Sequence, residues 1–307
     1  DDPETKRLAL YRIAEIDYAQ APATAGLRAM REFIAAYKND PAAATLVVRA
    51  YWFVAEAVGK NRPMQREHQA ALEDVVRAFD ASGLPPGSVA AEYAAQARFM
   101  LVDRIQELEN WKIDVGKPKT LEAYVQTLMR EIERGAQRAT AMKDGYEPVI
   151  AYNRPGWVIA AYVRQGRVYE LLTKAVLELP FVMPEDLNRE MRGFSAAERE
   201  EVRFQIEDRI RQVLDAQARP FECLAVVRFA LASRVARASS FDDAMTQLAI
   251  DRLQAYGEER IAQCIEEHRQ RDTTFEPYRP GEFTRAPRGL TLPLPEGVSA
   301  PAIEETP

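Results

Sequence analysis

The stretch ATAMKDGYEPVIAYNRPGWVIAAYVRQGRVY, from Ala139 to Tyr169, decides the fold. In its first half, Tyr146 and Val149 follow the spacing that places apolar side chains on one helical face. Residues 153–156, NRPG, then end that helix and begin another, because Asn and Pro mark helix boundaries. Small alanines in the second half let two helices press together. This pattern predicts an αα-hairpin, and we expect the hairpin to recur along the chain.

The composition favours an all-α protein. Of the 307 residues, 47% are hydrophobic and 29% are charged, and only 14 are Gly. Runs of alternating β-branched residues are absent, whereas Ala, Glu, Arg and Leu dominate. The net charge of −6 gives no electrostatic reason to expect a nucleic-acid partner.

Two earlier hairpins share one residue spacing. The second helix of the first hairpin has small, aromatic and helix-ending residues at relative positions 0, 4, 7 and 12, namely Ala29, Phe33, Ala36 and Pro41. The next hairpin repeats these offsets at Ala71, Val75, Ala78 and Gly83. This is the spacing of the second half of a tetratricopeptide unit, in which small residues admit the neighbouring helix.

The sequence therefore predicts stacked antiparallel helical hairpins, a TPR-like solenoid, over residues 1–185. Residues 186–271 are expected to form a C-terminal helical cap packed on that array, as terminal units of solenoids require. Pro148 is expected to kink a helix over residues 119–152, and Pro220 to break the long helix that opens after Ser195. A further helix is expected from Asp242 or Asp243 to about Gln270.

Residues 272–307 are rich in proline, which leaves no room for a long helix. We expect an extended or disordered tail, laid along the array through Phe275, Tyr278 and Phe283. Because such a tail cannot form core, removing everything after Gln270 is expected to leave the array folded.

A longer set of motifs resembles a narrower family. These motifs are Y-x2-V…P-G-W-V-I-A-A-Y…G-R-V-Y-E-L-L (Tyr146–Leu172), F-V-M-P-E-D-L (Phe181–Leu187), A-R-P-F-E-C-L-A-V (Ala218–Val226) and D-R-L-Q-A-Y (Asp251–Tyr256). The run is similar to large envelope repeat proteins of delta-proteobacteria, including those of the gliding-motility machinery. The resemblance implies a non-enzymatic, periplasmic scaffold whose partners are other envelope or motility-complex proteins. The hairpins here are longer than the tetratricopeptide unit of about 34 residues.

The sequence contains no recognisable set of catalytic residues. The sequence has no Gly-rich phosphate loop, Ser-centred elbow or His-Glu-x-x-His motif. We expect no enzyme activity, no cofactor and no metal. Cys264 and His268 stand four residues apart on one helix and could together ligate a metal. The alternative, which we favour, is a surface His beside a half-buried Cys.

The two cysteines, Cys223 and Cys264, lie in successive expected helices. Counting from the turn near Ser239 places them about 12 Å apart at a rise of about 1.5 Å per residue. That separation exceeds the limit of roughly 7 Å between the Cα atoms of a disulfide, unless the loop geometry or a bend near Gly257 absorbs the difference. We therefore expect two buried free thiols, with a disulfide as the alternative that would favour the envelope hypothesis.

The concave face of the array is the default site for a partner, because the first helix of each hairpin lines it. Polar or aromatic residues that interrupt the apolar stripe of those helices are the candidates: Arg12, Arg49, Trp52, Arg98, Arg164 and Arg167. They form either a groove for a peptide or helix, or packing contacts in which each Arg lies along the helix surface. The alternative function is a small-ligand or glycan module in which Tyr51, Trp52 and neighbouring Arg line a pocket.

No apolar run approaches the roughly 18 residues that cross a bilayer, since the best stretch, residues 47–58, contains Arg49 and Glu56. We expect no membrane span in this chain. The sequence shows no signal peptide, but it opens on Asp1 rather than Met, so that absence decides nothing about compartment. The periplasmic expectation depends on the family resemblance alone.

Overall fold

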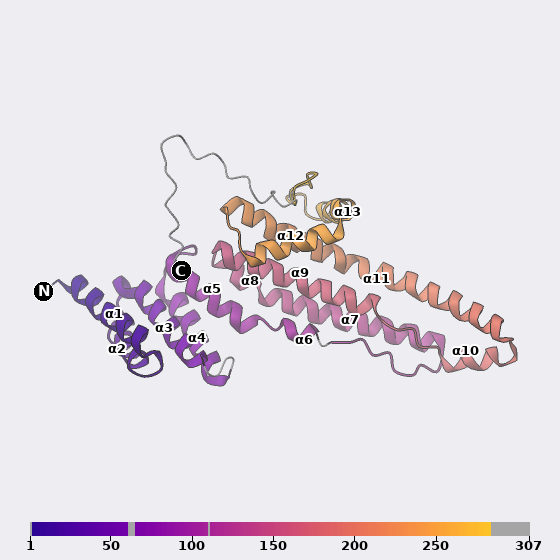
Figure 1. Cartoon of the computed structure of the whole chain (residues 1–307), viewed down its shortest axis with the longest axis horizontal. Coiled ribbons are helices and arrows are strands. Elements are labelled where there is room, and N and C mark those ends of the chain that lie inside the picture. The colour runs from indigo at the N-terminus through magenta and orange to yellow at the C-terminus, as the bar shows by residue number, and fades with distance from the viewer. Residues whose placement is uncertain (1, 61–64, 110, 284–307) are drawn as a thin grey trace, which may run out of the picture.

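The computed structural model describes residues 2–60, 65–109 and 111–283, and within them it contains helices and no strand (Figure 1). The all-α prediction is therefore confirmed. The α-helices are α1 (Pro3–Gln20), α2 (Leu27–Tyr37), α3 (Ala44–Gly59), α4 (Arg66–Ser82), α5 (Val89–Val102), α6 (Ile105–Glu109), α7 (Leu121–Gly145), α8 (Glu147–Ala151), α9 (Pro155–Leu177), α10 (Glu185–Glu190), α11 (Ala196–Ser239), α12 (Ala244–Tyr256) and α13 (Glu258–Arg269). Short turns of π-helix (Pro22–Gly26) and 3-10 helix (Pro41–Ala43 and Met191–Gly193) join some of them.

The helices form an elongated molecule with two halves of different build (Figure 1). Helices α1 to α5 are short and pack on their sequence neighbours. The long helices α7, α9 and α11 lie side by side in the other half, and α12 and α13 pack against α11. A single hydrophobic cluster runs from Phe99 to Phe283 and includes residues of α5 to α9 and of α11 to α13. This core crosses residue 185, the boundary that the sequence suggested.

The central hairpin forms where the sequence predicted it. Tyr146, Val149 and Ala161 are fully buried. At the turn, Asn153 adopts a positive φ of 53°, a conformation that Asn tolerates better than most residues. Arg154 is extended, as expected before a proline, and Pro155 starts α9 at a position that needs no backbone N–H.

Three helix boundaries differ from the expectation. The helix expected over residues 119–152 ends at Gly145, and α8 restarts with Pro148 in its first turn. Pro220 does not break α11, which runs unbroken for 44 residues, because burial of neighbouring residues such as Cys223 offsets the lost hydrogen bond. By contrast, Gly257, with a φ of 80°, divides the helix expected to reach Gln270 into α12 and α13.

Only some of the residues at the tetratricopeptide spacing are buried as that repeat requires. Phe33 and Val75 are buried as that spacing requires. Ala36, however, is exposed, and Ala78 is only partly buried against the cluster that includes residues of α3 and α5. Stacking of the hairpins as tetratricopeptide units stays a prediction.

The segment after α13 belongs to the core. Phe275 and Phe283 are buried, and Tyr278 packs partly buried against the same cluster. The segment therefore lies on the C-terminal helices, and removing it would expose apolar surface, contrary to the expected neutral truncation after Gln270. The rest of the expected tail, residues 284–307, lies outside the described residues.

One helical stretch, Pro41–Gly59, is long and apolar enough to cross a membrane when judged by length and composition alone. Its mean hydropathy is 1.3, and half of it is buried against neighbouring helices. The core helix of a soluble protein meets the same criteria, so this finding is weak evidence for a span.

We predict that Gly166→Ala destabilises the protein. A Cβ atom at residue 166 would lie 2.7 Å from Cε1 of Phe229, so α9 and α11 could not keep their present distance. Overpacking of this kind costs about 1–3 kcal/mol, which exceeds the helix-propensity gain of about 1 kcal/mol from Gly to Ala. The measurement is the free energy of unfolding from urea denaturation.

Gly145→Ala is the matched control, because the nearest atom to its added Cβ, in Val102, is 3.8 Å away. This variant should be neutral or slightly more stable. Equal stabilities for the two variants would contradict the close contact between α9 and α11.

Candidate functional site

The predicted partner-binding arginines make contacts within the protein. Arg49 Nη2 lies 2.8 Å from Glu15 Oε1, and the Arg49 guanidinium lies over the rings of Tyr11 and Phe53. Arg12 pairs with the same carboxylate, Glu15, one turn along α1. The Arg49–Glu15 pair joins α1 to α3 and engages Arg49 in the fold. The Arg12–Glu15 pair lies within α1, and the Arg12 side chain stays 72% exposed.

The other predicted residues are likewise engaged or dispersed. Arg164 pairs with Asp103 at 3.1 Å, and Arg167 pairs with Glu170. Trp52 packs against Tyr93 with ring centroids 6.3 Å apart. Arg98 Nε is buried without a hydrogen-bond partner among the described residues. The six candidates are spread over α1, α3, α5 and α9, so the structure does not gather them into one site.

Two carboxylates that the sequence analysis missed hold the central hairpin to α5. Glu92 accepts hydrogen bonds from Arg154 Nε at 2.6 Å and from Trp157 Nε1 at 2.8 Å. Asp103 accepts from the Tyr146 hydroxyl at 2.8 Å and from Arg164. Burial and the Asp103 charge raise the pKa of Tyr146, which keeps it a neutral donor.

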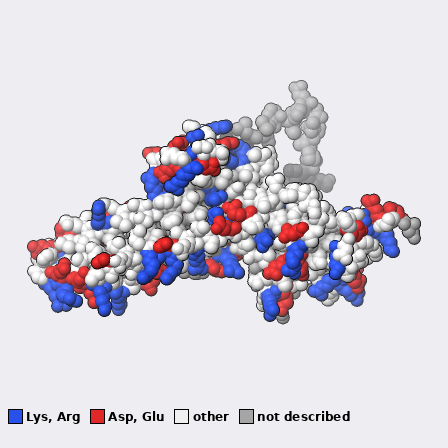
Figure 2. All heavy atoms as spheres, turned by 180° about the vertical axis from the view of Figure 1, so that it is seen from behind, with Lys and Arg blue, Asp and Glu red and all other residues white. Residues whose placement is uncertain are grey.

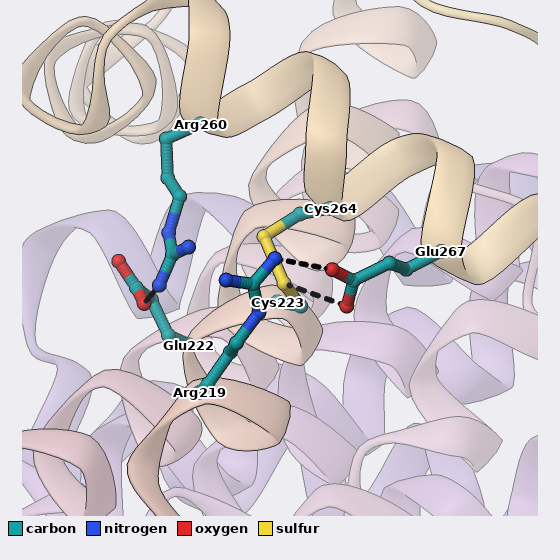
Figure 3. The surroundings of a disulfide bond; sticks show 6 residues. All are labelled: Arg219, Glu222, Cys223, Arg260, Cys264 and Glu267. Atoms are coloured by element: carbon teal, nitrogen blue, oxygen red, sulfur yellow. Dashed lines mark hydrogen bonds and ion pairs between the residues drawn. A yellow bond between two sulfur atoms is a disulfide. The ribbon is translucent and has the colours of Figure 1, made fainter. Parts of the chain in front are cut away.

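A disulfide joins Cys223 of α11 to Cys264 of α13, with their Cα atoms 4.7 Å apart (Figure 3). The favoured expectation of two free thiols was wrong, and the alternative, in which a bend near Gly257 brings the two cysteines together, is what the structure shows. The break at Gly257 turns α13 back over α11 and brings Cys264 close to Cys223.

Ion pairs flank the disulfide on both sides (Figure 3). Arg219 pairs with Glu267, and Glu222 pairs with Arg260, so each pair also connects α11 to α13. Glu267 Oε2 lies 3.7 Å from Cys223 Sγ, but a bonded sulfur has no proton to donate. The disulfide and the pairs together fix α13 on α11.

The metal alternative at Cys264 and His268 is excluded by this arrangement. Cys264 is fully buried in the disulfide and has no thiolate to offer. The His268 ring lies edge-on to Phe275, and burial lowers the pKa of His268. Over the described residues, no group of three or more metal-ligating side chains is present.

Arg234 of α11 holds the segment that follows α13. Its guanidinium donates to the Glu282 carboxylate at 2.8 Å and to the carbonyl oxygens of Glu276 and Pro277. It also lies over the rings of Phe275 and Phe283. Both side chains of the Arg234–Glu282 pair are largely buried, at 14% and 5% exposure. Such a pair is sensitive to loss of either partner.

An open groove lies between α2 and α4, with α3 as its floor. Two adjoining hollows of about 490 and 540 Å³ share Lys38, Tyr51 and Asp74. The floor is a stripe of α3 residues at alternating spacings of three and four: Ala44, Val47, Tyr51, Val54 and Val58. We call this feature the α2–α4 groove.

The α2–α4 groove lies away from the predicted binding residues. At 100° per residue, Arg49 and Trp52 project from the opposite side of α3, toward α1 and α5 respectively. Of the predicted binding residues, only Tyr51 lines the groove, together with Pro41, Ala71 and Ala78 of the repeat spacing. Ala44, Val47 and Val54 of the floor are buried in the core, so only Tyr51 and Val58 of the α3 stripe are partly exposed there.

Surface charge gives no single dominant sign. In the described part of the face in Figure 2, blue and red atoms interleave along the helices and leave broad uncharged areas between them. A face of this kind has no extended field of one sign that would attract a highly charged partner.

Comparison of the chain with models of known families, with curated proteins and with solved structures finds no match. The resemblance to envelope repeat proteins stays a prediction from the motifs themselves.

We predict that replacing both cysteines, in the variant Cys223→Ser/Cys264→Ser, lowers the free energy of unfolding. The disulfide closes a loop with a sequence separation of 41 residues. The chain-entropy estimate for such a loop is about 4 kcal/mol, and measured values are commonly about 2–4 kcal/mol. Reductant should destabilise the wild-type chain in denaturant titrations and leave the double variant unchanged. Equal effects of reductant on both proteins would contradict the bond.

We predict that Arg234→Met releases the segment 272–283 while the helices stay folded. The variant leaves the Glu282 carboxylate buried without its partner, and detachment of the segment relieves that cost. Trypsin should then cut after Arg271 much faster than in the wild type, as seen by mass spectrometry. Arg252→Met, which breaks an exposed pair with Glu170, is the control and should not change that rate.

Proposed function

We propose that this protein is a non-enzymatic protein–protein interaction scaffold in a bacterial cell-envelope complex. The observation that carries the proposal is the α2–α4 groove, an open hollow whose floor exposes parts of Tyr51 and Val58. A groove of this form suits a macromolecular segment, because a small ligand is usually enclosed on most of its surface.

The disulfide supports the proposed location of the protein in the periplasm. Bonded cysteines persist in oxidising compartments such as the periplasm and are rare where glutathione keeps thiols reduced. Cys264 is fully buried and Cys223 nearly so, which is typical of a structural bond and not of a transient redox pair. We therefore propose a periplasmic scaffold, and the motif resemblance favours gliding motility as the process it serves.

The repeat architecture belongs to the same proposal. Helices α1 to α5 pack in chain order, each on its neighbours, which is the packing of a stacked hairpin array. The finer assignment, a TPR-like solenoid capped by the C-terminal helices, would give the molecule the extended surfaces that scaffolds use.

The glycan or small-ligand alternative has less support. Tyr51 lies in the groove, whereas Trp52 packs against Tyr93 on another side of α3. The two aromatic residues therefore do not line one pocket, and sugar recognition has no paired aromatic surface at this place.

The proposal predicts that the chain is found oxidised and bound to other envelope proteins in its own cell. Cross-linking of intact cells, with purification through an antibody against the chain, identifies the partners by mass spectrometry. Alkylation before and after reduction reports the state of Cys223 and Cys264. We expect both cysteines to resist alkylation until reduced, and cross-links to envelope proteins. Alkylation of both thiols without reductant, or purification of the chain alone, would contradict the scaffold.

A further inference from the structure

We propose that the outer face of α1 pairs with α1 of a second copy of this chain, with the two helices parallel. We call this surface the α1 seam and define it as Ala9, Ile13 and Ile16, with Leu10 beside them. This inference goes beyond the scaffold function proposed above and does not depend on it. The features that carry it are the exposure of these apolar residues, their spacing and the charges on the two flanks.

The α1 seam is an apolar surface that the chain itself leaves open. Leu10, Ile13 and Ile16 are 41%, 54% and 56% exposed, so no other helix of the described chain covers them. Tyr11 and Ala14, on the opposite side of α1, are buried against the helices that follow. Helix α1 lies at one end of the elongated molecule, where its outer side is accessible (Figure 1). A contiguous patch of exposed apolar side chains marks an interaction surface.

The spacing of the α1 seam suits another helix. Ala9, Ile13 and Ile16 follow intervals of four and three residues and occupy about 60° of the helix circumference at 100° per residue. Two helices that lie along each other meet through residues at this spacing. Lys6 and Gln20, at the next positions of the same spacing, are polar and bound the seam at both ends. The buried residues of α1 lie on its other face, so the chain's own packing does not account for this spacing.

The charges beside the α1 seam are complementary to those of a second copy. Arg12 stands on one flank, and Asp17 stands on the other flank five residues later. In a parallel pair of helices, a residue on one flank faces the residue five positions later on the opposite flank of the other helix. Each Arg12 would therefore face Asp17 of the other copy. A two-fold axis along the helices makes this ion pair twice.

The same charges disfavour an antiparallel pair. Antiparallel helices related by a two-fold axis bring like flanks together, so Arg12 would approach Arg12 and Asp17 would approach Asp17. Like charges across an interface are unfavourable. Arg12 also pairs with Glu15 within α1, but its side chain is 72% exposed and can reach a second copy.

A lipid surface is the less favoured occupant of the α1 seam. Helices that lie in the plane of an anionic membrane surface are rich in Lys and Arg on their polar face. Helix α1, in contrast, has three basic and three acidic residues. This balance gives no net attraction to anionic lipid, whereas it provides both partners of the pair between two copies.

The test is the molecular mass of the full oxidised chain, measured by sedimentation equilibrium over a range of protein concentrations. We expect the mass to rise from one chain toward two as the concentration increases. The dimer should be weak, because one helix supplies fewer residues than the about 20–30 a side of a standard interface. Ile13→Glu should abolish the rise, since it places two carboxylates opposite each other in the seam.

Leu8→Glu is the matched control. Leu8 is 44% exposed on the same helix but lies about 120° away from Ile16, outside the α1 seam. The variant makes the same change in charge as Ile13→Glu and should dimerise like the wild type. Circular dichroism of both variants checks that α1 stays helical.

Charge reversal tests the parallel orientation. Arg12→Asp should weaken the dimer about tenfold, because it replaces two exposed ion pairs by two repulsions. The double variant Arg12→Asp/Asp17→Arg should recover the wild-type dissociation constant, because it forms the same pairs with their signs exchanged.

Several results would overturn this inference. They are a monomer mass at every concentration, equal loss of the dimer in Ile13→Glu and Leu8→Glu, and a double variant that dimerises no better than Arg12→Asp. Binding of the monomer to phosphatidylglycerol vesicles that Ile13→Glu abolishes and Leu8→Glu does not would assign the seam to a lipid surface. These outcomes leave the scaffold proposal intact, since whole-cell cross-linking tests it through any surface of the chain.

Discussion

The close packing of α9 against α11 is the constraint on which the rest of the structure depends. Gly166 makes it feasible, because any Cβ at this position would collide with Phe229. Ala160 and Ala161 are buried on the same helix. Helix α9 lies in the centre, and α5, α7 and α12 all pack on it. The long hydrophobic cluster forms around α9. Packing between helices, more than the propensity of any one helix, stabilises such a fold.

Polar interactions fix how the elements join around this core. Glu92 and Asp103 on or beside α5 receive donors from the central hairpin, and Arg234 holds the last described segment. Each carboxylate is satisfied by more than one donor, which is the condition under which a partly buried charge is tolerated. The disulfide adds a covalent link between α11 and α13, beside the buried Ile261 and Ile265 of α13.

The N-terminal half is built from helices that pack on their sequence neighbours. Helices α2 and α4 both pack on α3, and Val47 and Val54 on the α3 face between them are buried in the core. The hollow between α2 and α4 is therefore a surface depression with charged residues at its edges, and Tyr51 and Val58 are partly exposed on its floor.

The sequence by itself determined the helical class, the central hairpin and the aromatic contacts of the segment after α13. Local signals suffice for these, because helix period, Asn-Pro turns and buried aromatic residues act over a few positions. It misjudged Pro220, and it left open whether the chain bends near Gly257, since whether a helix continues through Pro or Gly depends on what the neighbouring turns bury. The preference for free thiols at Cys223 and Cys264 followed from counting the residues after 243 as one continuous helix. Only the tertiary structure decided that Arg49 and Arg164 form ion pairs between helices and that the groove lies between α2 and α4. Both depend on the relative placement of helices, which no local pattern encodes.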